Sequence, residues 1–236
     1  LYYYRQAGAV DPESIPSYMG QGNSLSAMQQ YYQSLTMFEQ ALALDPKNKE
    51  ALLGKGLALA AQKNLTSAME CVRELVAIDP HSYAAYSNLG SLQAAMGNYD
   101  DAEKSLEAAC RINASVGDLW RNLATIYYMS GQHSQSAEAF KKATDLDPED
   151  ASAWIGLGLA QNQSGKPDEA MKSFERAIYI DPRNKEAHYN LGLALAGQDR
   201  LKEALEAFEK VLEMDPEDPL ARFAANLTQS RMKIAA

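Results

Sequence analysis

The residues best suited to metal or redox chemistry are three histidines and two cysteines. His81, His133 and His188 lie far apart, and no two of them have the i, i+4 spacing that puts two metal ligands on one helical face. Cys71 and Cys110 have no metal-ligand spacing and give no disulfide framework. The sequence therefore predicts no metal site, and both cysteines are expected to be small buried side chains.

One glycine-rich segment, GLGLAQNQSGKP, could be taken for a phosphate-binding loop. More residues separate Gly158 from Gly165 than the P-loop pattern allows, Lys166 is followed by proline, and no strand is predicted before the segment. The chain also lacks the GxSxG nucleophile motif. These observations predict a protein that is not an enzyme and needs no cofactor.

Three asparagines suggest a different chemistry, the binding of a peptide backbone. Asn88, Asn122 and Asn190 lie 34 and 68 residues apart, and Gly54 and Gly156 fill the other places of this row. An amide side chain both donates and accepts a hydrogen bond, so a row of amides suits an extended peptide. The alternative is that each asparagine bonds to nearby backbone or to solvent, and the sequence leaves both open.

The spacing of 34 residues runs through the chain. The dipeptide Asp-Pro recurs with it, at Asp45-Pro46, Asp79-Pro80, Asp147-Pro148, Asp181-Pro182 and Asp215-Pro216. Small residues recur at Gly22, Gly56, Gly90, Ala124, Gly158 and Gly192. Bulky residues recur at Phe38, Val72, Leu106, Phe140, Phe174 and Phe208. The period divides the chain into six units: 15–48, 49–82, 83–116, 117–150, 151–184 and 185–218.

Each unit has the pattern of two helices joined by a turn. In the fourth unit Trp120, Leu123 and Tyr127 recur at i, i+3 and i+7, which predicts a helix with one apolar face, and Gly131 interrupts the pattern. Proline ends the second helix, because the residue before it is pushed out of the α region. Two residues after each proline stands a good N-cap for the next helix: Asn48, Ser82, Asp150, Asn184 and Asp218.

The unit resembles the tetratricopeptide repeat in its length and in its order of aromatic, Leu-Gly, small, Phe, Ala and Pro positions, as in AWIGLGLAQNQSGKPDEAMKSFERAIYIDPRN. The resemblance implies an all-α fold, a right-handed superhelical solenoid of stacked helix–turn–helix repeats that serves as a scaffold. Gln21, Leu25 and Gln29 in the first unit and Lys55 in the second depart from the family pattern. These two units are therefore expected to pack less regularly.

Both ends of the chain are expected to extend the array. Tyr4 stands one period before Phe38, so residues 1–14 are expected to be the second helix of a truncated preceding repeat, and the natural protein is expected to extend upstream. Residues 219–236 are expected to form a C-terminal capping helix over the last core face. Its apolar face would consist of Leu220, Phe223, Ala224 and Leu227.

The first helices of such an array line its inner wall, and a stripe on them is not needed for the core. This stripe predicts a concave groove that binds an extended peptide or an amphipathic helix. Its expected contact residues are Leu53, Leu57, Asn88, Arg121, Asn122, Tyr128, Ile155, Leu159, Tyr189, Asn190 and Leu193. The two-carboxylate clamp of tetratricopeptide co-chaperones is not expected, because its cations and asparagines are replaced by Ser87, Ser91, Ser152 and Gly156.

Composition narrows the partners and the location. The 236 residues carry a net charge of −9, which disfavours binding to nucleic acid or to an anionic membrane. No apolar run is long enough to span a bilayer, and no signal peptide is visible. The segment is expected in the cytoplasm or the periplasm, with any anchor or signal upstream of it.

These observations together predict a non-catalytic scaffold that binds a protein or peptide, as part of a multiprotein assembly. Two alternatives stay open. The segment could be the repeat array of a larger enzyme or of a secretion or assembly machine, or it could be a structural module that associates with itself.

Overall fold

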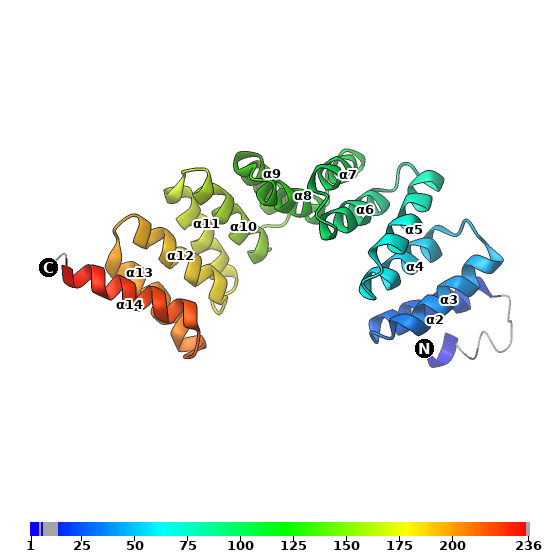
Figure 1. Cartoon of the computed structure of the whole chain (residues 1–236), viewed down its shortest axis with the longest axis horizontal. Helices are drawn as coiled ribbons and strands as arrows, with labels where there is room; N and C mark the ends of the chain where they lie inside the picture. The colour runs from blue at the N-terminus through cyan, green and yellow to red at the C-terminus, as the bar shows by residue number, and fades with distance from the viewer. Residues whose placement is uncertain (5, 7–13, 235–236) are drawn as a thin grey trace. The chain divides into compact units, whose positions relative to one another are not determined.

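The computed structural model describes residues 1–4, 6 and 14–234, and these residues contain no strand. The chain divides into two compact units, each made of several 34-residue repeats. The first compact unit is Leu1–Ala114 and the second is Ser115–Ala236. The first unit holds α2 (Ile15–Ala27), α3 (Tyr31–Leu44), α4 (Lys49–Ala61), α5 (Leu65–Ile78), α6 (Tyr83–Ala95) and α7 (Tyr99–Ile112). The second holds α8 (Gly117–Met129), α9 (His133–Leu146), α10 (Ala151–Gln163), α11 (Pro167–Ile180), α12 (Lys185–Gly197), α13 (Leu201–Met214) and α14 (Pro219–Ile234) (Figure 1).

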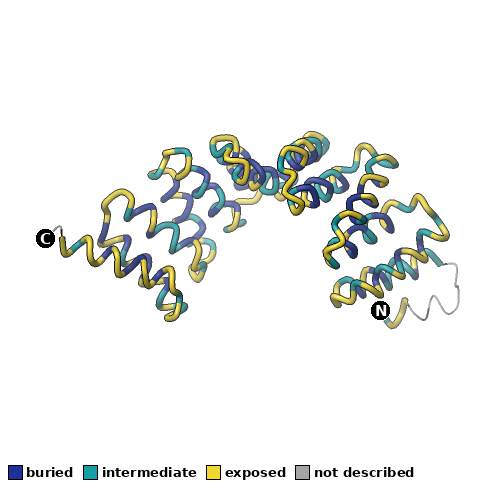
Figure 2. Tube along the Cα trace, in the orientation of Figure 1, coloured by how far each residue is buried: buried dark blue, intermediate teal, exposed yellow. Residues whose placement is uncertain are grey.

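Each unit is a stack of helix pairs. Within a pair the two helices pack on each other, as α6 does on α7 and α10 on α11. The second helix of one pair also contacts the first helix of the next, as α3 contacts α4 and α11 contacts α12. Figure 2 shows that the buried residues lie where neighbouring helices face each other. The predicted all-α repeat array is confirmed.

The expected N-caps stand immediately before α4, α6, α10, α12 and α14. Asn48, Asp150 and Asn184 each accept a hydrogen bond from the backbone N–H three residues on, at 3.0, 3.1 and 3.0 Å. Ser82 and Asp218 cap α6 and α14 in the same way. A helix start leaves backbone N–H groups without partners, so each cap fixes where a helix begins.

The turn inside each pair needs one residue in the left-handed conformation. Glycine fills this place in three pairs, with φ of 80°, 77° and 76° at Gly97, Gly131 and Gly165. Non-glycine residues adopt the same conformation in three others, with φ of 58°, 62° and 59° at Gln29, Lys63 and Asp199. The departure at Gln29 therefore keeps the turn and adds backbone strain.

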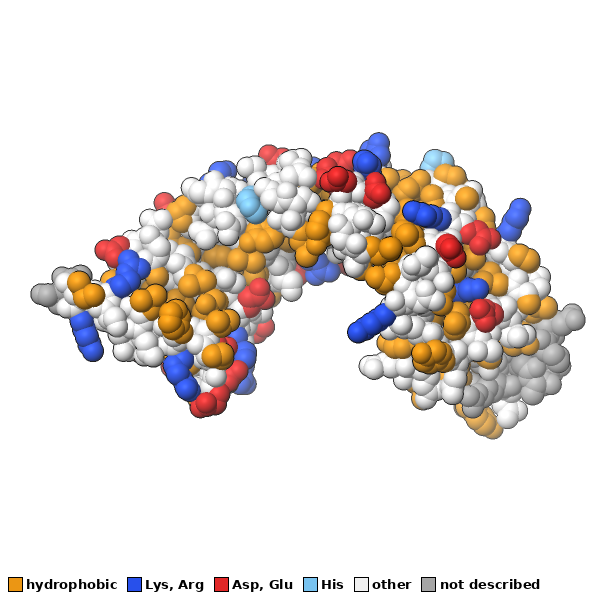
Figure 3. All heavy atoms as spheres, viewed as in Figure 1, with side chains coloured by type: hydrophobic (Ala, Val, Ile, Leu, Met, Phe, Trp, Pro, Cys, Tyr) orange, Lys and Arg blue, Asp and Glu red, His pale blue; other side chains and the backbone are white. Residues whose placement is uncertain are grey.

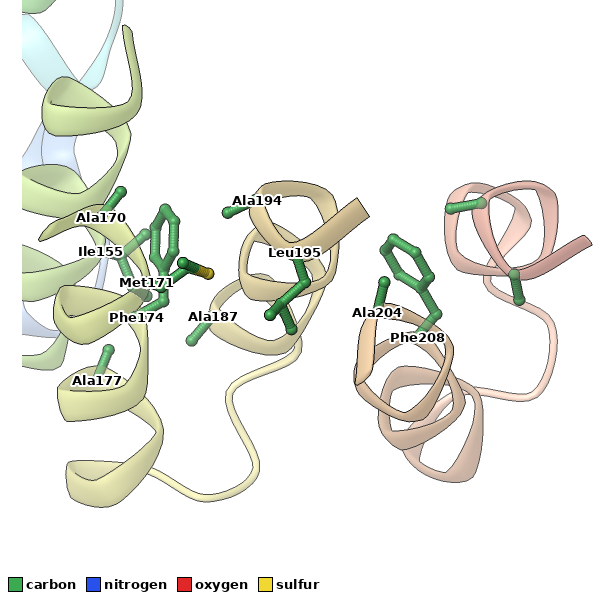
Figure 4. Close-up of a cluster of buried hydrophobic side chains, with 12 residues drawn as sticks. Ile155, Ala170, Met171, Phe174, Ala177, Ala187, Ala194, Leu195, Ala204 and Phe208 are labelled. Atoms are coloured by element: carbon green, nitrogen blue, oxygen red, sulfur yellow. The ribbon is translucent and has the colours of Figure 1, made fainter. Parts of the chain in front are cut away.

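Figure 4 shows the core of the second unit, in which large side chains pack among alanines. Phe174 and Phe208 are each 1% exposed, and Ala177 and Ala187 are fully buried. A Cβ built on Gly158 would lie 2.5 Å from the Phe174 ring, so the small residue lets the two helices of the pair approach closely. The expected burial of the bulky residues is confirmed at Phe38, Val72, Leu106, Phe140, Phe174 and Phe208.

The C-terminal helix packs through a different face from the one expected. α14 contacts α13 and α12, and its buried residues are Ala221, Ala224, Ala225 and Thr228. Leu220, Phe223 and Leu227 are instead 61%, 70% and 53% exposed, so the prediction that they cover the core is wrong for these three residues. Alanines allow α14 to lie close to α13, and the larger side chains then point away from that contact.

The described part of the N-terminal segment repeats a contact seen inside the array. Residues 2–4 are helical, and the ring of Tyr4 lies 2.3 Å from the place of a Cβ on Gly20. The Tyr4 carbonyl accepts a hydrogen bond of 2.6 Å from the Ser17 hydroxyl. Phe38 and Gly54, one period later, pack in the same way. The rest of the expected helix, at residues 5 and 7–13, lies outside the described residues.

Candidate peptide-binding site

A pocket of about 440 Å³ opens on the first-helix face of the second unit. α8 and α10 form its walls, and the start of α12 closes one end. Five of the predicted groove residues line it, namely Arg121, Asn122, Tyr128, Ile155 and Leu159. The other lining residues are Thr125, Phe140, Ser152, Gly156, Asn184 and Glu186.

The floor of the pocket is apolar because of a glycine. A Cβ built on Gly156 would lie 2.3 Å from Cζ of Phe140, so the Phe140 ring occupies the space that a side chain on α10 would need. Ile155 and Leu159 flank the ring on the same helix. Ile155 and Phe140 are each 5% exposed and belong mainly to the core, whereas Leu159 is half-buried.

The predicted cation of the groove is held by two carboxylates. Arg121 Nη1 lies 2.9 Å from Asp150 Oδ2, and Nη2 pairs with Asp118 on the preceding turn of α8. The Asp150 side chain also caps α10, so Arg121 ties the two helices together. The guanidinium therefore lines the pocket, and both of its terminal nitrogens already bond to carboxylates of this chain.

The asparagine row is not uniform. Asn88 donates from Nδ2 to the Ala84 carbonyl of its own helix at 2.8 Å, which is the alternative that the sequence left open. Asn122 lines the pocket, and Asn190 lies half-buried on α12. Because Gly156 separates the last two, the second unit presents amides on α8 and α12 and an aromatic floor between them.

The remaining predicted residues lie outside the pocket. In the first unit, Leu53 packs against the core and Leu57 is 50% exposed. In the second unit, the ring centroids of Tyr189 and Phe208 lie 5.8 Å apart with the rings tilted by 54°, and Leu193 is 43% exposed. The pocket thus joins five of the predicted residues, and α12 continues the same face with three more, Tyr189, Asn190 and Leu193.

Two pocket residues come from outside the first-helix stripe that the sequence predicts. Phe140 had been assigned to the core alone, and Asn184 to the cap of α12. The sequence signal for Phe140 is Gly156 on α10. It holds the position that Asn122 holds on α8, and a glycine there leaves room for the Phe140 ring. No three metal-ligating side chains gather anywhere in the described ranges, and no helix there is long and apolar enough to cross a bilayer.

Comparison with family models identifies the class of protein that this fold and face define. Models described as tetratricopeptide repeat match residues 19–83 and 121–184, residues 81–149 and residues 161–227. The first of these models alone covers more than half of the chain, so the chain belongs to the tetratricopeptide repeat family. Members of this family generally mediate protein interactions and are generally non-catalytic.

Solved structures share the fold. PilF of Pseudomonas aeruginosa superposes with a TM-score of 0.77 at 15% identity, covering 92% of this chain and 97% of that one. YrrB, described as a TPR protein with an unusual peptide-binding site, gives 0.70 at 24% identity, covering 80% and 97%. MamA gives 0.64 at 27% identity, covering 73% and 94%. No curated protein sequence matches the chain.

Proposed function

We propose that this protein is a non-catalytic interaction scaffold that binds a peptide or an amphipathic helix of a partner protein on its first-helix face. The observation that carries the proposal is the pocket between α8, α10 and the start of α12, whose lining comes almost entirely from first helices. Binding there would recruit the partner into a multiprotein assembly.

The composition of the pocket supports this use. Ligand sites combine an apolar floor, which supplies binding energy, with a few polar groups that fix orientation. Here the half-buried Leu159 provides accessible apolar surface and the largely buried Phe140 ring lies in the lining with it, while Asn122, Thr125 and Ser152 provide hydrogen-bonding groups at the edge. The site is open on one side, which suits a continuous chain segment better than an enclosed small molecule.

Photocrosslinking tests the proposal. A benzophenone amino acid placed at Leu193 lies on the first-helix face, and one at Tyr179, which is 74% exposed on α11, lies on a second helix. In native extract we expect a discrete partner adduct from the Leu193 position and none from Tyr179. An adduct from Tyr179 alone would show that partners bind the other face.

Two alternative functions predict different measurements. If the segment is the array of a larger enzyme or machine, the natural chain in its source cells will have a mass well above 25.9 kDa. If it is a self-assembling module, light scattering will report oligomers of the purified protein without any partner. A partner adduct on a monomer of this mass favours the scaffold.

A further inference from the structure

The charges around the pocket are unevenly matched. Arg121 is its one cationic lining residue within the described part of the chain, and that guanidinium is already paired with Asp118 and Asp150. Glu186 also lines the pocket, is exposed, and has no ion pair with any described residue. Two carboxylates therefore share the one guanidinium, and Glu186 adds an unmatched carboxylate to the lining, so negative charges outnumber positive ones at the site.

The floor beside Glu186 suits a long side chain with a charged end. Lysine and arginine lay their methylene stems along apolar surface and keep the charged group in water. The half-buried Leu159 offers such a surface, and Glu186 stands at the α12 end of the same pocket. A carboxylate of a partner would instead meet Glu186 and an Arg121 guanidinium that is already paired with two carboxylates.

An apolar wall continues from the pocket towards the C-terminal helix. The face of α10 that carries Ile155 and Leu159 recurs one period later at Tyr189 and Leu193, and two periods later at Phe223 and Leu227. The helices follow each other in space, since α12 contacts both α10 and α14. Leu193, Phe223 and Leu227 are 43%, 70% and 53% exposed, and Figure 3 shows hydrophobic side chains gathered over α14.

This wall is separate from the packing of α14. At about 100° per residue, Leu220, Phe223 and Leu227 are centred roughly 120° around the helix from the buried residues Ala221, Ala224, Ala225 and Thr228. Burying α14 therefore does not need the larger side chains. A contiguous apolar patch that folding leaves exposed marks an interaction surface.

We infer that the partner segment is amphipathic and cationic: a lysine or arginine enters the pocket beside Glu186, and its apolar side chains cover the wall of Tyr189, Leu193, Phe223 and Leu227. The inference deepens the proposed function and rests on it. The unmatched carboxylate and the adjoining wall together favour this occupant over an acidic peptide or a second copy of this strongly acidic chain.

Three synthetic peptides test the charge. Each is about 16 residues long, enough to form a helix when bound, and carries one leucine face. The other face carries lysine, glutamine or glutamate. By fluorescence anisotropy in about 0.15 M salt, we expect the lysine peptide to bind most tightly and the glutamate peptide least. Equal affinities, or tighter binding of the glutamate peptide, would overturn the inference.

Matched variants separate the pocket from the overall charge of the protein. Glu186→Gln and Glu175→Gln change the net charge equally, but Glu175 is exposed on the second helix α11. Glu186→Gln should weaken the lysine peptide about fivefold and Glu175→Gln less than about twofold. Phe223→Ser should weaken it about tenfold, and Tyr179→Ser on α11 should not. Equal effects within either pair would mean that the peptide binds elsewhere.

The outcomes also distinguish this inference from the proposed function. If Leu193 crosslinks a partner in extract but the glutamate or glutamine peptide binds best, the scaffold function stands and the cationic partner is wrong. If neither peptides nor partners reach the first-helix face, both proposals fail. If light scattering shows a dimer that Phe223→Ser converts to monomer, a second copy covers the wall and the inference is overturned.

Discussion

The ring of Phe140 occupies the space that a side chain on Gly156 would fill, with the Cβ position only 2.3 Å from Cζ of the ring. The same relationship joins Phe38 to Gly54, at 2.5 Å. In each case an aromatic residue on a second helix meets a glycine on the first helix of the next pair. Close approach of two helices thus depends on an absent side chain, and at Gly156 this contact also makes the pocket floor.

Gly156→Ala is expected to destabilise the protein, although alanine normally favours a helix. The new methyl group would overlap the Phe140 ring, and overpacking of this kind costs about 1–3 kcal/mol. The free energy of unfolding from urea titration measures the effect. Combining Gly156→Ala with Phe140→Val should destabilise by less than the sum of the two single substitutions, because the smaller side chain makes room.

Gly197→Ala is the matched control for that experiment. Gly197 also lies in a first helix, but no atom comes within 4 Å of its Cβ position. Alanine there should be neutral or should stabilise by up to about 1 kcal/mol through helix propensity. If both substitutions change stability alike, the contact with Phe140 has no special cost.

The turn residues should respond in opposite directions to substitution. Gly131 has φ of 77°, so Gly131→Ala should cost about 1 kcal/mol in unfolding free energy. Lys63 holds φ of 62° at the equivalent turn, and Lys63→Gly should gain about 0.5 kcal/mol, because relief of strain exceeds the added entropy of the unfolded chain. A loss of stability in Lys63→Gly would show that its side chain contributes more than the backbone strain costs.

The repeat architecture could be predicted from the sequence because its determinants are local or one period apart. Caps such as Asn48 act within one turn of helix, and turn glycines such as Gly131 act on their own backbone. The burial of Phe174 likewise follows from a residue type that recurs every 34 positions. A single sequence therefore displays these features several times.

The site was less predictable because its chemistry depends on differences between repeats. The sequence predicts Arg121 as a cation available to a partner. In the structure its guanidinium pairs with Asp150, which lies 29 residues later in the chain. Phe140 lines a pocket only because Gly156 faces it. α14 has two apolar stripes, one of larger side chains and one of alanines. The alanine stripe packs on the array, because small side chains allow closer approach of the helices. None of these outcomes is fixed by the repeat pattern alone.

An ion pair between the start of the first helix and the end of the second helix of one repeat should make stability depend on pH. Lys49 Nζ lies 2.8 Å from Asp79 Oδ2, and this contact lowers the pKa of the Asp79 carboxyl below its ordinary 3.8. A group with a lowered pKa in the folded state stabilises above its unfolded pKa and loses that effect as pH falls through the folded pKa. The same pair raises the pKa of Lys49 above 10.5, so its effect is lost at high pH.

A double-mutant cycle with Asp79→Asn and Lys49→Gln measures this coupling. Urea unfolding at neutral pH should give a positive coupling between the two side chains, and the coupling should vanish well below pH 3.8. Added salt should reduce it, because both groups are partly exposed. A coupling that persists unchanged in acid would mean that packing, not charge, joins the two residues.

Cys71 is expected to be inert in the folded protein. The side chain is buried in the core of the first unit, and burial raises the pKa of its thiol above the ordinary value because the thiolate loses its hydration. The thiolate is the reactive form, so in a Cys110→Ala background an aromatic disulfide reagent at pH 8 should react no faster than the protein unfolds. Ser130→Cys, at an exposed turn, should react at once in the same background. Rapid labelling of Cys71 without denaturant would show that α5 opens locally, independently of global unfolding.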